Sequence, residues 1–149
     1  MIKTNMHYIP FFDGTSVCFG YAAEKIMVKY LRSKYSHEYK IRRKKYAGHD
    51  IQMTHKVTGE IIRIEIKAAR QGKDKKYRAT TYKRNHTDYR KSDIIIFLAF
   101  NPVDKGRYAT PFIIPTVTWD KNYIAITSNP QTYNGAIAKY RNAWDGLIC

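Results

Sequence analysis

Three side chains near the middle of the chain have the types and the spacing of a metal site. In an extended strand side chains alternate between faces, so Glu65 and Lys67 point to one side and Ile64 and Ile66 to the other. The stretch before them is hairpin-like and places Asp50 on the neighbouring strand. Two carboxylates suit Mg²⁺, which binds phosphate oxygens beside one or two protein carboxylates. The amine of Lys67 could then orient or activate a water.

The overall charge of the chain indicates which class of phosphate-containing molecule would bind at these residues. The chain has 27 Lys and Arg residues against 12 Asp and Glu residues, a formal net charge of +15. Such a balance produces a positive potential that raises encounter rates with polyanions, and it favours a nucleic acid as the partner. Part of the charge could instead serve solubility.

Length and composition limit the architecture. A chain of 149 residues with 44% apolar content is expected to form a single domain with its own core, residues 1–149. Residues 117–149 are expected to be a C-terminal extension that serves an oligomer interface or DNA contact. With no long apolar run and no signal pattern over 1–10, we expect a soluble intracellular protein, cytoplasmic or nucleoid-associated, without a membrane partner. Cys18 and Cys149 are expected to be reduced thiols.

Hydrophobic periodicity predicts one helix followed by a three-stranded meander. Apolar residues recur at helical spacing over 17–31, and Glu24 is the single acid on the otherwise basic opposite face. Strands are predicted over 39–46, 50–54 and 61–68, separated by residues typical of turns.

The second half of the chain is less regular. Residues 71–90 are polar and basic without a clear period, and they are interpreted as a loop or an irregular strand. The apolar run 93–100 predicts a strand buried on both faces at the centre of the sheet. Residues 108–115 have prolines near both ends, as suits an edge strand. A short helix is predicted over 135–144 in the tail.

Glu24 on the first helix, Asp50 on the second strand and Glu65-Ile66-Lys67 on the third stand in an order that resembles the PD-(D/E)XK nuclease superfamily. Gly20-x-x-x-Glu24, the run Arg-Ile-Glu-Ile-Lys-Ala-Ala-Arg over 63–70, and Ser92-Asp93 resemble most the small intron-encoded homing endonucleases of this type. Archaeal Holliday-junction resolvases share much of the layout. The resemblance spans roughly residues 16–116 and implies an α/β fold with a restriction-endonuclease-like core, a mixed central β-sheet flanked by helices.

The resemblance also implies a catalytic set of Glu24, Asp50, Glu65 and Lys67. Asp50, Glu65 and the carbonyl of Ile66 would coordinate Mg²⁺, or Mn²⁺ in its place, against the scissile phosphate, and Lys67 would orient the attacking water. Glu24 would hold a second metal through water or align the nucleophile, and its alternative role is a salt bridge on the helix surface. His49 stands where the superfamily pattern has proline, whereas Glu65 keeps the carboxylate that some homing enzymes replace with glutamine.

Two histidines flank the strand that carries Asp50. His49 and His55 could serve as a general base or a metal pair, but they would lie far apart along the strand, so satisfied or solvated histidines are expected.

DNA contacts are expected from the basic residues on both sides of the site, where Lys and Arg can neutralise phosphates or reach base edges. The candidates are Arg42, Arg43, Lys44, Lys45, Arg70, Lys73, Lys75, Lys76, Arg78, Lys83 and Arg84. Gln71 and Asn85 could read adenine.

Because one catalytic site cuts one strand, cleavage of a duplex requires two subunits, and a homodimer or higher homo-oligomer is expected. The candidates for its interface are aromatic and apolar residues of the tail, although packing onto the protein's own sheet is the commoner fate of such side chains: Trp119, Tyr123, Ile124, Tyr133, Tyr140 and Trp144.

Three functions remain open. The first is a site-specific endonuclease of homing or restriction type that cuts double-stranded DNA. The second is a structure-specific nuclease such as a junction resolvase, which would use the same catalytic residues. The third is a non-catalytic DNA-binding protein whose carboxylates form surface pairs; a metal requirement would exclude it.

Overall fold

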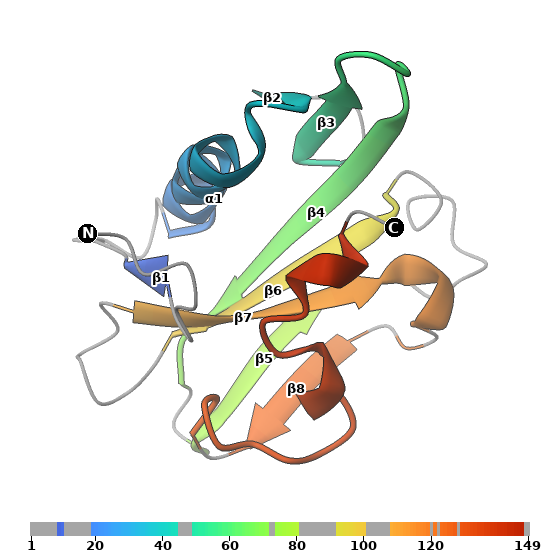
Figure 1. Cartoon of the computed structure of the whole chain (residues 1–149). Coiled ribbons are helices and arrows are strands. Elements are labelled where there is room, and N and C mark those ends of the chain that lie inside the picture. The colour runs from blue at the N-terminus through green and yellow to red at the C-terminus, as the bar shows by residue number, and fades with distance from the viewer. Residues whose placement is uncertain are drawn as a thin grey trace.

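A mixed β-sheet forms the centre of the protein, with one helix against one face and a small second sheet against the other (Figure 1). The computed structural model describes residues 9–10, 19–44, 49–71, 74–80, 92–100, 108–119, 121, 123–127 and 129–147. The strand order of the central sheet is β1-β7-β6-β4-β3-β2. Its one parallel pair among the described strands is β4 with β6. The expected α/β fold with a mixed central sheet is confirmed.

The strands of the central sheet are β1 (Ile9–Pro10), β2 (Tyr39–Arg43), β3 (Ile51–His55), β4 (Ile61–Ala69), β6 (Ile94–Phe100) and β7 (Tyr108–Pro115). The second sheet pairs β5 (Lys76–Thr80) with β8 (Tyr123–Thr127). Short 3₁₀ turns lie at Thr116–Thr118 (η3), Ala138–Tyr140 (η4) and Trp144–Gly146 (η5).

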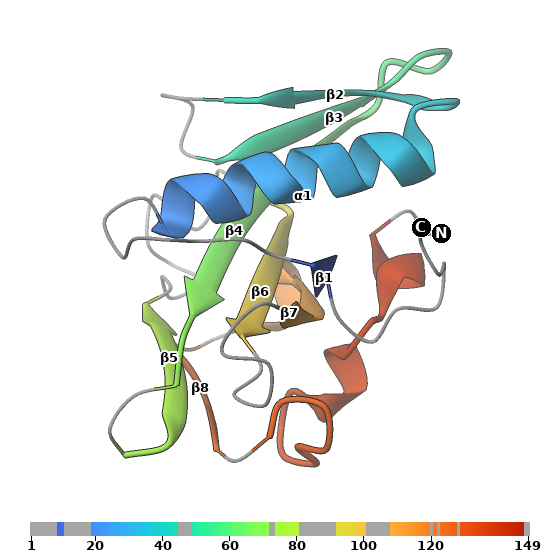
Figure 2. The same ribbon diagram turned by 90° about the vertical axis from the view of Figure 1, so that its left-hand side faces the viewer.

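The predicted helix is α1 (Phe19–Tyr35), which lies across the sheet in Figure 2. Ala23, Met27 and Leu31 follow each other at four-residue spacing, so they share one face of the helix. All three are fully buried in a core that also contains Ile64 and Ile66 of β4. The alternating apolar residues of β4 therefore dock against α1.

The predicted meander is also confirmed, as an antiparallel β2-β3-β4 unit. A tight turn joins β3 to β4, and Gly59 has a left-handed φ of +76° there, which favours glycine. His55 Nδ1 accepts hydrogen bonds from the N–H groups of Val57 (3.2 Å) and Thr58 (3.1 Å). The His55 side chain thus stabilises this turn, as expected for a satisfied histidine.

The central position of the apolar run is confirmed, because every residue of β6 is buried between β4 and β7. Asp93 fixes where β6 meets β4: its N–H donates to the Arg63 carbonyl (2.7 Å), and its Oδ2 accepts the Arg63 N–H (2.8 Å). The edge position expected for β7 is wrong, because β7 pairs on its outer side with the two residues of β1, and its Phe112 also makes a bridge to Arg141.

Two parts of the sequence fold differently from the prediction. The polar stretch after β4 contains the regular strand β5, and it pairs with β8, a strand the sequence reading did not identify. Tyr77, Ile124 and Ile126 are buried in a second core on the sheet face away from α1. The short helix predicted over 135–144 is wrong: the segment contains η4, and Asn142 then adopts a left-handed φ of 53° that ends helical backbone.

The C-terminal segment packs onto the protein's own cores. Trp144 and Leu147 join the core under α1, whereas Ile124 and Ile137 join the second core. Tyr123 is the member of the proposed interface set that remains exposed, with 55% of its surface accessible. Among the described residues no helix is long and apolar enough to cross a membrane.

Candidate functional site

Asp50 directly precedes β3, at the end where the pairing between β3 and β4 stops. The Asp50 N–H donates to the Ile64 carbonyl (2.9 Å), and its own carbonyl accepts the Lys44 N–H (2.8 Å). Its side-chain Oδ2 accepts the N–H of Ile66 (2.7 Å), in the place where a neighbouring strand would otherwise pair. The Asp50 carboxylate is therefore held against the edge of β4 by a charge-assisted hydrogen bond.

Ile66 presents a second oxygen at the same place. In a strand the N–H and the carbonyl of one residue point to the same side, because paired residues exchange both bonds. The Ile66 N–H reaches Asp50, so the Ile66 carbonyl faces the Asp50 side of β4 as well.

Glu24 is brought to Asp50 by α1. Its side chain is half-buried, and burial is the largest cause of a pKa raised from 4.5 to about 7. The hydrogen bond to the Asp50 side chain and the charge of Asp50 raise the pKa further, whereas the positive charge of Arg43 lowers it. Two carboxyl groups in contact retain a proton more strongly than either alone. Glu24 is thus part of a carboxyl pair, beyond the helix-surface salt bridge that the sequence left open.

Arg43 lies near this carboxyl pair because side chains alternate between the two faces of β2. Tyr39 and Ile41 are buried toward α1, and Arg43 follows them at two-residue spacing on the same face. The sequence reading assigned Arg43 to DNA contact alone. The alternation of β2, visible in the sequence, could have indicated its place near Glu24.

Glu65 and Lys67 form an ion pair on the opposite face of β4 from Ile64 and Ile66. The distance from Lys67 Nζ to Glu65 Oε1 is 3.1 Å, with 25% and 18% of the two side chains exposed. The register between β3 and β4 ends at Ile51 and Ile64, one position before Glu65 on β4. Asp50 therefore contacts, through Ile66, the same stretch of β4 that carries Glu65 and Lys67, and Glu24 reaches Asp50 from α1.

The Asp50 and Glu24 carboxylates are oxygen ligands of the kind that a hard divalent cation takes. Asp50 and Glu24 share a hydrogen bond that needs a proton, and loss of that proton would leave the Asp50 carboxylate charged to bind a cation. The described part of the chain contains no group of three or more His, Cys, Asp or Glu residues close enough to hold a metal ion. A cation here would consequently depend on a main-chain carbonyl, waters or substrate oxygens for its remaining ligands, as Mg²⁺ commonly does.

The predicted DNA contacts lie on both sides of this stretch. The exposed ones are Arg42, Arg70, Lys75, Lys76 and Arg78, while Arg43 and Lys44 are half-buried. Arg78 pairs with Asp74 at 2.6 Å. Lys45, Lys73, Lys83, Arg84 and Asn85 lie outside the described residues.

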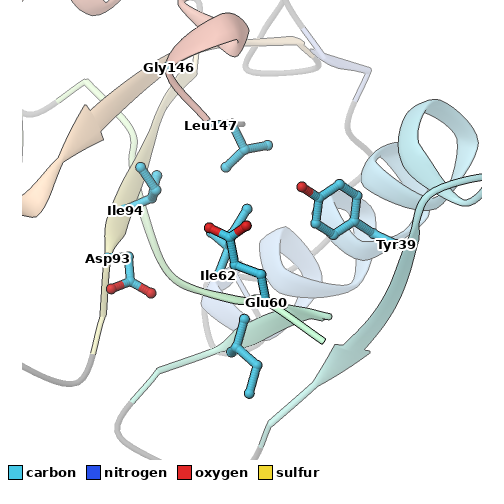
Figure 3. Close-up of a pocket in the computed structure, with 8 residues that line it drawn as sticks. Tyr39, Glu60, Ile62, Asp93, Ile94, Gly146 and Leu147 are labelled. Carbon is cyan, nitrogen blue, oxygen red and sulfur yellow. The ribbon is translucent and has the colours of Figure 1, made fainter. Parts of the chain in front are cut away.

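A cavity of about 300 Å³ lies at the other end of β4, beside the starts of β4 and β6. Figure 3 shows the Glu60 carboxylate directed into it, with Tyr39 and Leu147 on either side. None of the predicted catalytic residues lines it. The carboxyl pair and the ion pair on β4 both lie outside this cavity.

Comparison with known proteins finds a similar fold among solved structures. No protein-family model matches the chain. No curated protein matches it. Among solved structures the chain is similar to a bacterial homing endonuclease, I-Ssp6803I, with a TM-score of 0.59 and 13% sequence identity over 91% of this chain and 93% of that one. The similarity covers nearly the whole of both chains and shows a shared fold.

Proposed function

We propose that the protein is a Mg²⁺-dependent, site-specific endonuclease of homing or restriction type that hydrolyses phosphodiester bonds in double-stranded DNA. The observations that carry the proposal are the contact of Glu24 with Asp50 and the hydrogen bond from the Ile66 N–H to Asp50, on the strand that also carries the Glu65–Lys67 pair. The fold shared with a homing endonuclease supports it, as does the net charge of +15. The order of these residues is that of the PD-(D/E)XK pattern.

In this proposal the metal is held by Asp50, Glu65 and the Ile66 carbonyl, and Mn²⁺ could replace Mg²⁺. When bound it supplies Lewis acidity beside the scissile phosphate and acidifies water. Asp50 needs little reorganisation, because the Ile66 N–H already fixes its Oδ2. A ligand held in place before the reaction lowers the cost of reaching the transition state.

Lys67 would orient the attacking water and stabilise negative charge as it develops on the phosphate. Its ion pair with Glu65 holds the ammonium at the site in the free protein. Glu24 would align the nucleophile, or support a second ion through water. Arg43 would keep Glu24 more acidic than burial alone would leave it.

One set of these residues cuts one strand, so we further propose that the active form is a homodimer or a higher homo-oligomer. Two copies related by a two-fold axis would place one site on each strand of the duplex.

The experiment that tests the function incubates the purified protein on a complex DNA library and on a synthetic four-way junction, each with Mg²⁺ and with chelator. Discrete Mg²⁺-dependent breaks at a rare library sequence are expected. Cutting of the junction alone would identify a junction resolvase instead. Binding without any cut would indicate a non-catalytic DNA-binding protein.

A further inference from the structure

The face of β2, β3 and β4 that points away from α1 carries polar side chains that the catalytic site does not use. Alternation and register place Lys40, Arg42, Gln52, Thr54 and Arg63 together on it, and we call these five residues the open face. Lys40 is opposite Thr54, while Arg42, Gln52 and Arg63 form a row across the three strands. Glu65 and Lys67 continue along β4 on the same side.

The open face contributes nothing to either hydrophobic core. The inward neighbours Ile41, Met53 and Ile62 pack under α1. The second core, which β5 and β8 help to form, takes only Ala69 from β4 among the described residues. Figure 1 shows β5 and β8 lying beyond the far end of β4, away from β2 and β3. Lys40, Arg42 and Arg63 are exposed, and Gln52 and Thr54 are half-buried.

The chemistry of this surface matches duplex DNA. Three of its five side chains are cations, none is acidic, and Gln52 offers an amide that can both donate and accept. The Arg63 guanidinium lies 3.9 Å from Asp93, with 44% and 50% of the two side chains exposed. Such exposed pairs contribute little to stability, so Arg63 can exchange this contact for one with DNA. The major groove admits an antiparallel β-ribbon, and Arg and Gln are side chains that pair with guanine and adenine there.

The rise of a β-strand and the rise of B-DNA give the distance between the open face and the scissile phosphate. A strand rises about 3.3 Å per residue and B-DNA about 3.4 Å per base pair along each strand. Arg63 precedes Glu65 by two positions on β4, and Gln52 is opposite Arg63. For a duplex lying along β4, this row therefore faces base edges about two base pairs from the phosphate at Glu65.

We propose that the open face determines the sequence specificity of the nuclease. Gln52 and Arg63 read base edges about two base pairs from the scissile phosphate, while Lys40 and Arg42 contact the phosphate backbone. This inference rests on the proposed function, because it assumes that duplex DNA reaches Glu65 and Lys67.

The test compares cleavage of a DNA library randomised around the cut site by the wild type, a Gln52→Ala/Arg63→Ala double variant and Lys40→Ala. The double variant should still cut, but its discrimination at positions about two base pairs from the break should fall by roughly 5- to 150-fold. Lys40→Ala should weaken cutting of every sequence about equally. Lys29→Ala is the matched control, since Lys29 is an exposed lysine on α1, and it should change neither quantity.

The outcomes separate the two proposals. A wild type that cuts selectively while the double variant keeps the same base preference would overturn the role of the open face and leave the nuclease intact. A wild type that neither binds nor cuts duplex DNA would overturn both.

Discussion

At the scale of single residues, the contact between Glu24 and Asp50 couples the site to protons. Burial and the neighbouring carboxylate raise the Glu24 pKa from 4.5 to about 7. The folded protein therefore binds a proton that the unfolded chain releases between these two pH values. Because the native state holds more protons there, stability falls as the pH rises from about 4.5 through 7 and then levels off.

Glu24→Gln should remove this component, since glutamine keeps a hydrogen-bonding side chain but cannot ionise. In chelator, the melting temperature of the wild type should decline across this pH range more steeply than that of Glu24→Gln. Thermal melts of both proteins at closely spaced pH values measure the difference. Parallel pH profiles would mean that Glu24 and Asp50 do not share a proton.

Lys67 is expected to act on the reaction and not on DNA affinity. Lys67→Ala should slow cleavage by about 10²- to 10³-fold, the range seen when a group that stabilises developing negative charge is removed. Single-turnover cleavage and fluorescence anisotropy with the same duplex measure the two effects. Lys56→Ala is the control, because Lys56 lies in the β3–β4 turn, where its amine donates to the Ser36 carbonyl (2.6 Å). If affinity and rate fell together in Lys67→Ala, the catalytic role would be wrong.

At the scale of elements, α1 and the meander position the site, and both could be predicted from their periodicity. Alternation in β4 places Glu65 on the other face of the strand from Ile64 and Ile66, whichever strands β4 pairs with. Periodicity could not show that the Asp50 side chain takes the Ile66 N–H, because that bond depends on where β3 and β4 separate. β5 and β8 were missed because each has five residues and they pair across nearly fifty positions of sequence.

Leu31→Ala should destabilise the protein by about 2–5 kcal/mol, because it leaves a cavity where a fully buried side chain packs between α1 and β4. Urea unfolding monitored by circular dichroism gives the free energy. Lys29→Ala on the exposed face of the same helix should stay within about 0.5 kcal/mol of the wild type. Equal effects of the two substitutions would contradict the packing of α1 on β4.

Trp144 tests the role of the C-terminal segment. Its ring lies 5.0 Å from that of Tyr30, and the Lys34 ammonium lies 5.1 Å from its centroid. Trp144→Ala should cost about 3–5 kcal/mol and lower the melting temperature equally at every protein concentration, as for a core residue. A loss that diminishes as the concentration rises would identify Trp144 as an interface residue. Tyr123→Ala, at an exposed position, should leave dilute-solution stability unchanged.

At the scale of the whole molecule, the two sides of the central sheet differ in what covers them. α1 covers one side and supplies Glu24, while the other side of β2, β3 and β4 presents cationic and amide side chains toward solvent. With a net charge of +15, DNA affinity should weaken steeply with salt, so binding and cleavage are best compared at one ionic strength. The net charge and the order of the motif residues could be predicted from the sequence. The open face could not, because it depends on how β2, β3 and β4 pair in three dimensions.

The most direct test of the account is single-turnover cleavage of duplex DNA by the wild type and by Asp50→Asn, each with Mg²⁺ and with chelator. Asparagine can still accept the Ile66 N–H, so the variant should fold and bind DNA while lacking the carboxylate charge that we propose holds the metal. We expect the wild type to cut only when Mg²⁺ is present, and Asp50→Asn to cut under neither condition. Cutting that persists in chelator, or in Asp50→Asn with Mg²⁺, would contradict this expectation.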